Sequence, residues 1–145
     1  MKQEAATAVD VRQWAPEQAA DALRAAGCRV TGPRVAVLRS LLEIDSTVDA
    51  PTLTAHAAQY QPGIHEATVY RTVNVLCEAG LASHVHAGHG PSLVRLGGDD
   101  QLVAMCQRCG AIEPVPAGHL QALVDEMRAS TGFTLVPGHF ALEGV

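Results

Sequence analysis

Apolar residues in the first part of the chain recur at helical spacing, and turn-forming residues separate the resulting segments. The first segment ends at Gly27, a residue type that commonly ends helices. Thr31 and Asp49 are suited to cap the second and third segments. The pattern therefore predicts helices at 16–26, 31–44 and 49–60.

A fourth apolar stretch, 65–79, buries one face and presents the other. Val69, Val73 and Leu76 share one side. Two alternating segments, 81–86 and 92–96, follow with a turn between them, as in a β-hairpin. Helices followed by a hairpin predict a winged helix-turn-helix, a DNA-binding arrangement in which the last helix lies in the major groove.

The two glycines and two aspartates at 97–100 have no apolar side chains to bury in a core, so this segment is predicted to be a linker. After it we expect a β-β-α-β unit with strands at 101–105 and 111–115, an amphipathic helix around 120–127 and a last strand at 133–142. The fold class is thus α+β, with a winged helix-turn-helix domain at 1–97 and an α/β dimerisation domain at 98–145. The second unit is small, and pairing with a second copy would cover its apolar surface.

Composition narrows the functional classes. The chain has 145 residues, of which 48% are hydrophobic and 17% charged, so it can bury a core and is not a disordered protein. Its net charge of −5 does not indicate a nucleic-acid binder. The charge is unevenly placed, however, because 8 of its 10 Lys and Arg residues precede residue 98. Neither a secretory signal nor a membrane span is recognisable, so we expect a cytoplasmic protein with reduced thiols and no membrane partner.

The presented helix carries side chains that can read DNA. Those near its start reach base edges in the major groove, where an arginine can bind guanine and a tyrosine ring can contact a thymine methyl group. Arginines flanking the second helix are suited to phosphate contacts that set the register. The candidate DNA contacts are Arg29, Arg34, Thr68, Tyr70, Arg71 and Asn74.

Histidines two positions apart on a predicted strand form a candidate metal site. His84 and His86 project from the same side, His89 adds a further nitrogen, and His139 can close the site if the second domain folds back. Asp100 or Glu113 would supply an oxygen. Nitrogen-rich ligation favours zinc, nickel, cobalt or iron(II) over magnesium or calcium, and the residues do not select among them.

Cys106 and Cys109 form half of a zinc knuckle. A closed structural zinc site needs four ligands, and Cys28 and Cys77 lie in helical segments of the other domain. A thioredoxin-like role would require the pair at the start of a helix, whereas here it lies between strands. Structural zinc therefore stays open, and we expect no oxidoreductase.

Four strings in this chain resemble the ferric uptake regulator family of bacterial metal-responsive repressors. They are RVTGPR (29–34), ATVYRT (67–72), CQRCG (106–110) and GHF (138–140). The string GLASHVHAGHG (80–90) looks most like the nickel-responsive branch of actinobacteria. The resemblance runs from about residue 17 to the end and implies a homodimer that represses genes when a divalent metal occupies the hinge region.

The chain departs from that family pattern in three places. DDQLV (99–103) replaces a histidine-rich string, and Val48 and Asp49 stand where a helix-side histidine is expected. The printed sequence also ends about where many members begin a second C-x-x-C, so this chain is either trimmed or lacks structural zinc. The surviving inter-domain site would comprise His84, His86 and His139, so the protein answers to a different metal or is constitutively active.

The leading hypothesis is a dimeric repressor of operator DNA that is gated by a divalent transition metal and is not an enzyme. A winged-helix regulator that senses peroxide or redox state, through the histidines or the Cys106 and Cys109 thiols, is the alternative. A metallohydrolase built on a zinc-bound water is chemically conceivable, but it lacks an obvious general base and leaves the presented helix without a purpose.

Overall fold

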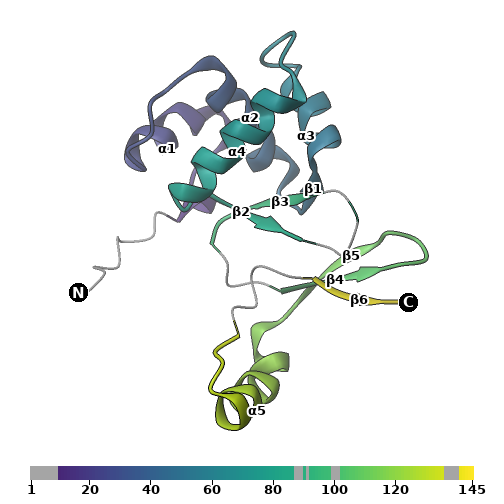
Figure 1. Cartoon of the computed structure of the whole chain (residues 1–145). Helices are drawn as coiled ribbons and strands as arrows, with labels where there is room; N and C mark the ends of the chain where they lie inside the picture. Colours follow the sequence, from purple (N-terminus) through teal and green to yellow (C-terminus); the bar gives the residue numbers. More distant parts are fainter. Residues whose placement is uncertain (1–9, 87–89, 91, 99–101, 136–140) are drawn as a thin grey trace.

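The computed structural model describes residues 10–86, 90, 92–98, 102–135 and 141–145. Figure 1 shows the helices α1–α4 gathered at one end of the molecule and α5 at the other, with the strands between them. The amino-terminal helices thus lie on one side of the strands, and the carboxy-terminal helix projects from the opposite side.

The helical elements of the amino-terminal part begin at residues that satisfy their own first N–H groups. The hydroxyl of Thr31 accepts a hydrogen bond from the Arg34 N–H at 3.4 Å, and the carboxylate of Asp49 accepts one from the Thr52 N–H at 2.7 Å. The elements are η1 (Val11–Gln13), η2 (Pro16–Gln18), α1 (Ala19–Ala25), α2 (Gly32–Ile44), α3 (Ala50–Ala57) and α4 (Glu66–Glu78).

Aliphatic side chains from all of these α-helices meet in one core. Burying each leucine stabilises the fold by about 1.5–3 kcal/mol relative to leaving it exposed. The core therefore fixes the orientation of α4, whose outer face is the one offered to a partner. The fully buried leucines of this core are Leu23, Leu38, Leu41, Leu53, Leu76 and Leu81.

An antiparallel sheet closes the bottom of this core. It consists of β1 (Val48–Asp49), β3 (Leu93–Leu96) and β2 (Ala82–Val85), in that order, with His84 opposite Val94. Strands β2 and β3 are the predicted hairpin, and their loop is partly outside the described residues. Strand β1 is not predictable from periodicity, because two residues carry no pattern.

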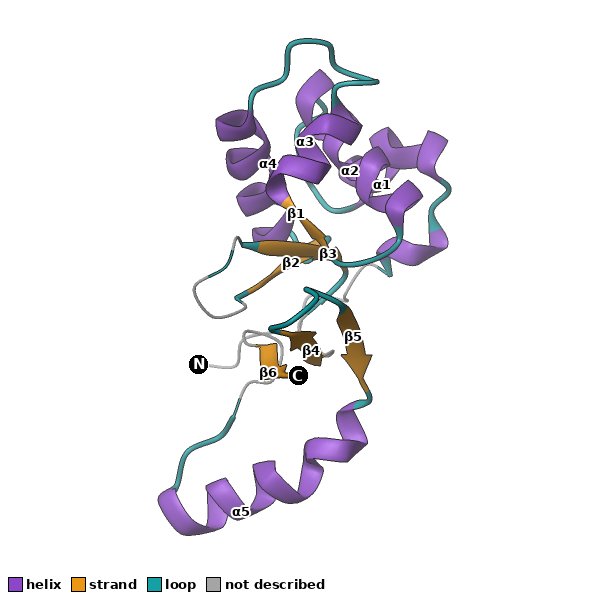
Figure 2. Cartoon of the chain, turned by 90° about the vertical axis from the view of Figure 1, so that its right-hand side faces the viewer, coloured by secondary structure: helices purple, strands orange, loops and turns teal. Residues whose placement is uncertain are grey.

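The carboxy-terminal part contains a second sheet and a helix. Strand β4 pairs antiparallel with β5 and parallel with β6, giving the order β5-β4-β6. Figure 2 shows α5 running away from these strands at the far end of the molecule. The elements are β4 (Leu102–Cys106), β5 (Ile112–Val115), η3 (Ala117–Leu120), α5 (Gln121–Thr131) and β6 (Ala141–Gly144).

A second, smaller cluster joins the two sheets. Val85 and Leu93 of the hairpin are buried against Val103 of β4, with Met105 and Ile112 packed beside them. The hairpin therefore contacts the helical core on one side and the carboxy-terminal sheet on the other.

The structure contains the predicted helices and strands in the predicted order and corrects several boundaries. The third helix ends at Ala57 instead of residue 60, and the helix expected around 120–127 runs to Thr131. The first helix opens as η2 and becomes α-helical only at Ala19. The last strand is Ala141–Gly144; residues 133–135 have no regular structure, and 136–140 lie outside the described residues. The prediction of a strand from residue 133 was wrong because Phe133, 70% exposed, packs on no sheet. In the part of the chain that the structure describes, none of the helices is long and apolar enough to cross a bilayer.

Candidate nucleic-acid interface and metal site

Helix α4 presents the predicted polar face. Val69, Val73 and Leu76 are buried, whereas Arg71 and Asn74 are exposed. Thr68 and Tyr70 are half-buried at the edge of that face. The burial pattern anchors the helix by one side and leaves a guanidinium and an amide on the other, as a helix that enters a groove requires.

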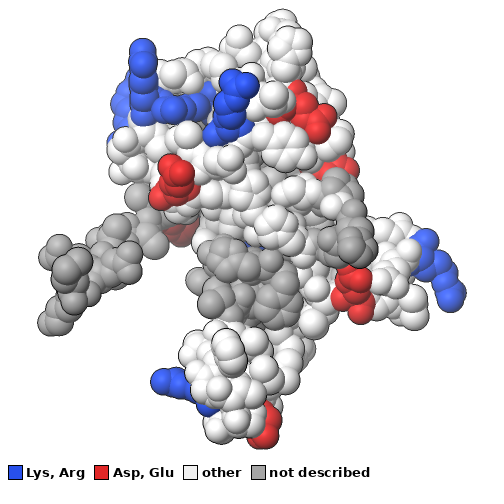
Figure 3. Space-filling model, viewed as in Figure 1, with Lys and Arg blue, Asp and Glu red and all other residues white. Residues whose placement is uncertain are grey.

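Arginines at the start of α2 lie beside one another. Arg29 is exposed and Arg34 is half-buried, and the Arg34 guanidinium donates to the backbone carbonyl of Arg29 at 3.0 Å. This bond holds Arg34 next to the loop that carries Arg29. Figure 3 shows a group of positive side chains over the helical domain, on the side of α1 and α4, and others near α5 and at the right-hand edge of the view. The local charge is therefore suited to phosphate, despite the acidic chain as a whole.

Asn74 contacts a candidate metal ligand. Its side-chain oxygen lies 2.9 Å from Nε2 of His84, and Nδ1 of His84 lies 3.3 Å from the Ser92 hydroxyl. The bond links α4 to β2 across the turn at Gly80. Asn74, predicted as a DNA contact, thus also belongs to the surroundings of the metal site.

The surroundings of the His84 imidazole favour its neutral form. Burial lowers the pKa of His84, and the neighbouring His86 lowers it further. A neutral imidazole keeps a lone pair for a metal ion at neutral pH.

The rings of His84 and His86 are neighbours in the structure. Their ring centroids lie 6.3 Å apart, and the ring planes differ by 18°. A shared ion would have to lie at the ring edges, where the imidazole nitrogens are, because these nitrogens bind a metal in the plane of the ring at about 2 Å. The donor chemistry of two imidazoles fits a divalent transition metal.

The approach of the last strand brings the chain end towards this site. The Ala141 N–H donates to the His86 carbonyl at 3.0 Å. His139 precedes Ala141 by two residues, and its own placement, like that of His89 and Asp100, lies outside the described residues.

The structure does not bring Glu113 to the pair of histidines. Glu113 is exposed on β5, opposite Ala104. Within the described ranges, His, Cys, Asp and Glu side chains form no group of three or more that could hold an ion. The oxygen donor expected from Glu113 therefore has no support in this geometry.

Cys106 and Cys109 lie on a tight turn at the end of β4. Cys106 is half-buried and Cys109 is exposed. The backbone N–H groups of Cys109 and then Arg108 point at the Cys106 sulfur and lower the pKa of that thiol. Gly110, at φ +73°, closes the turn and donates to the Cys106 carbonyl at 2.8 Å. The turn supplies two sulfur ligands, or one reactive thiolate.

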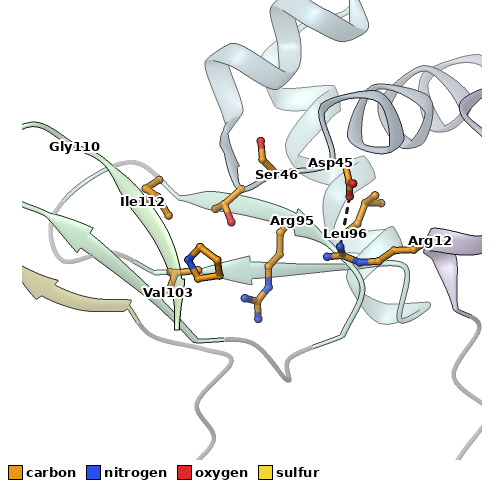
Figure 4. Close-up of a pocket in the computed structure, with 10 residues that line it drawn as sticks. Arg12, Asp45, Ser46, Arg95, Leu96, Val103, Gly110 and Ile112 are labelled. Carbon is orange, nitrogen blue, oxygen red and sulfur yellow. Dashed lines mark ion pairs between the residues drawn. The ribbon is translucent and has the colours of Figure 1, made fainter. Parts of the chain in front are cut away.

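A cavity that sequence reasoning missed lies beside the junction of the two sheets. Its volume is about 470 Å³, and Arg95, Leu96 and Val103 are among its lining residues (Figure 4). Arg95 is only 3% exposed, and its Nε donates to the Ser83 hydroxyl at 3.1 Å. The only signal in the sequence is a charged residue inside an apolar strand, which does not by itself indicate burial.

A polar network between α2 and α3 was also missed. The Tyr60 hydroxyl donates to the Glu43 carboxylate at 2.6 Å, and His56 contacts Ser40 at 3.0 Å and Glu43 at 3.6 Å. The Arg39 guanidinium lies 4.2 Å from the centre of the Tyr60 ring. These contacts fix the packing of two helices and lie outside the candidate site.

Comparison with known proteins shows which sequences this chain is similar to. A family model described as the ferric uptake regulator family matches residues 25–142. A ferric uptake regulation protein of Brucella suis is 34% identical over 125 residues, covering 83% of this chain and 85% of the relative. A peroxide-responsive repressor, PerR, of Staphylococcus epidermidis is 27% identical over 96 residues, covering 66% of this chain and 64% of the relative.

A solved structure with the same fold is that of the Vibrio cholerae ferric uptake regulator. It matches with a TM-score of 0.69 and 26% identity, covering 86% of this chain and 96% of the other, and its description refers to its DNA-binding domains. The expected fold class, a winged-helix domain followed by a smaller dimerisation domain, is confirmed.

Proposed function

Because this chain belongs to the ferric uptake regulator family, we propose that it is a metal-dependent repressor that binds operator DNA as a homodimer. Members of the family are metal-responsive transcription regulators and not enzymes, which excludes the metallohydrolase hypothesis. A protein that acts on the chromosome works in the cytoplasm, and we place this one there.

The observation that carries the proposal is the pairing of His84 and His86 at the end of the wing. The centroids of the two rings lie 6.3 Å apart, and the His86 carbonyl accepts from the Ala141 N–H, where the last strand of the carboxy-terminal domain meets the hairpin. His139 is the proposed third ligand, because its chain position is within about 7 Å of Ala141. Asp100 is the proposed oxygen donor.

DNA binding is proposed for the exposed face of α4 and the start of α2. Arg71 would bind a base edge in the major groove, with Thr68 and Tyr70 beside it. Arg29 and Arg34 would bind phosphates and set the register.

In this proposal, the bound metal ion controls the distance between the two α4 helices of the dimer. Half-sites on one face of DNA lie about 34–36 Å apart, so a dimer binds tightly only when its recognition helices match that spacing. A bound ion would supply a bridge of coordinate bonds between wing and carboxy-terminal domain. The histidine ligands would then hold the wing in one orientation relative to the carboxy-terminal domain. Metal binding would thereby shift the population towards dimers whose α4 helices match the half-site spacing.

Exposed apolar side chains support a homodimer. Leu123 on α5 is 48% exposed and Phe133 after it is 70% exposed, and no residue of α5 is buried within one chain. A second copy would cover this surface.

The identity of the metal is a finer proposal. The donor set suits nickel, zinc or iron(II), and the string at 80–90 favours the nickel-responsive branch. At the knuckle, structural zinc would need two ligands beyond Cys106 and Cys109.

A peroxide- or redox-sensing regulator is the second candidate. Two observations favour it, namely the PerR relative and the lowered pKa of the Cys106 thiol. Peroxide treatment followed by mass spectrometry would then show added oxygen on the histidines or loss of free thiol at Cys106 and Cys109. Unmodified protein after loss of DNA binding would contradict it.

The test of the leading proposal is metal-dependent DNA binding. A duplex selected from a random library by the purified protein with Ni²⁺, Zn²⁺ or Fe²⁺ should bind more weakly after chelation. Elemental analysis should give one gated ion per chain that His84→Ala removes, whereas the matched change His119→Ala on exposed η3 should retain it. Equal DNA affinity with and without chelator would refute metal gating.

A further inference from the structure

The side chains around His84 define which of its nitrogens carries the proton. Its Nε2 faces the side-chain oxygen of Asn74 on α4 at 2.9 Å, and its Nδ1 faces the hydroxyl of Ser92 at 3.3 Å, just before β3. The ring is thus held between the recognition helix and the opposite strand of the wing.

The chemistry of the two partners settles the tautomer. An amide oxygen can only accept a hydrogen bond, so Nε2 of His84 must carry the hydrogen. Nδ1 then has the lone pair, and the Ser92 hydroxyl, which can donate or accept, donates to it. Of the two nitrogens, Nδ1 alone can bind a cation without breaking the bond to Asn74.

We propose that Asn74 is a positioning residue that holds the Nε2–H of His84 and so directs its Nδ1 to the metal ion, coupling the site to the recognition helix. The inference rests on the proposed function, in that it deepens the role of the same site. Metal-bound histidines usually donate their second N–H to a fixed acceptor, which orients the ring and raises its basicity. Here the acceptor is part of the DNA-reading helix.

The coupling follows from the place of Asn74 on α4. It is exposed, three residues after Arg71 on the proposed DNA-binding face, and its oxygen contacts the wing. A polarised Nε2–H binds the Asn74 oxygen more strongly, which fixes the orientation of that amide. Since linkage is reciprocal, DNA that engages the amide must raise metal affinity by the same factor.

The first experiment uses metal-free protein, so its outcome does not depend on the proposed function. Long-range ¹H–¹⁵N correlation spectra of the imidazoles should show His84 as the Nε2–H tautomer. Asn74→Ala should give a mixture of tautomers, and the matched change Ser92→Ala should keep Nε2–H. A wild-type His84 that is protonated on Nδ1, or a spectrum that Asn74→Ala leaves unchanged, would overturn the inference.

The second experiment measures Zn²⁺ affinity by competition with a chromophoric chelator. Asn74→Ala should weaken binding about 10–100-fold, whereas Ser92→Ala, which removes a competitor for the lone pair, should not weaken it. Asn74→Asp retains an acceptor and should restore Zn²⁺ affinity while reducing DNA affinity, because it places a negative charge on the DNA face. That split between the two affinities is not expected of a residue with only a structural role.

The outcomes separate the two proposals. If wild type and His84→Ala bind Zn²⁺ equally, the proposed metal site fails, and the tautomer spectra still decide whether Asn74 positions His84. If His84 binds Zn²⁺ and Asn74→Ala binds it as tightly as wild type, the metal site stands and the role of Asn74 is refuted.

Discussion

Replacing Arg71 with alanine should cost sequence discrimination, whereas replacing Arg34 should cost affinity for any duplex. Arg71 is exposed on α4, and the positions three and four residues away hold no acid that could pair with it along the helix. Arg34 is tied to the Arg29 carbonyl at 3.0 Å, beside the start of α2. The first is free to reach a base edge, and the second is fixed where a phosphate would pass.

The two changes should differ in size and in salt dependence. A base contact is worth about 1–3 kcal/mol per half-site, so Arg71→Ala should reduce the preference for the selected duplex over a scrambled one by that amount in each half. Each lost phosphate contact should reduce the slope of log K against log salt by about 0.9, or about 1.8 for a dimer. Between 50 and 200 mM salt, a slope change of 1.8 corresponds to a factor of about 12.

Arg24→Ala is the matched control. Arg24 lies on α1 and pairs with Asp21 of the same helix at 2.8 Å, so its charge is already partly neutralised. Fluorescence anisotropy with selected and scrambled duplexes at several salt concentrations measures all three variants. The reasoning is refuted if Arg71→Ala weakens both duplexes equally, or if Arg34→Ala and Arg24→Ala change the slope by the same amount.

The remaining predictions concern stability and thiol chemistry. Leu76→Ala should lower the free energy of unfolding, measured by urea titration, by about 2–5 kcal/mol, because Leu76 of α4 is fully buried in the core. The loss would be smaller if neighbouring side chains closed the cavity that the substitution creates. The Tyr60 hydroxyl lowers the pKa of Glu43 from 4.5, so its contribution to stability is present above pH 4.5 and is lost as the pH falls through the lowered pKa. The difference in melting temperature between wild type and Tyr60→Phe should therefore shrink in acid, and a difference that grows there would contradict this. The backbone N–H of Cys109 lowers the pKa of Cys106, so the rate of alkylation at Cys106 should have a pH midpoint below 9.0, and a midpoint at or above that value would show that the thiol is ordinary.

The helical domain was predictable because its signals are local. Apolar spacing of three and four residues fixed the buried face of α4, and Thr31 and Asp49 marked the starts of α2 and α3. The same locality lets the sequence place His84 and His86 on one side of the hairpin, since residues two apart on a strand share a side.

Contacts that depend on packing between elements were not predictable. Asn74 and His84 are ten positions apart on a helix and a strand, and only the turn at Gly80 sets their separation. Arg95 lies between apolar neighbours on β3, and a strand pattern cannot show that both of its faces are covered. Phe133 resembles the start of a strand, but Gly132, at φ +77°, ends α5 and leads into irregular backbone.

The unequal size of the two apolar clusters explains why one ion can act on the whole molecule. The helical core is large and fixes α4 to the wing, whereas the wing meets the carboxy-terminal sheet through a few buried side chains, Val85, Leu93 and Val103. Allosteric coupling energies of about 1–3 kcal/mol, or 5–150-fold in affinity, are small against the first cluster and about as large as the burial of one side chain of the second. A ligand bridge at His84 and His86 would therefore change the angle between the domains and leave the fold of each domain intact. The bond from His84 to Asn74 lies within the helical domain, where the large core fixes α4 to the wing. A reorientation of the wing relative to the carboxy-terminal domain would therefore move α4 with it as a rigid body.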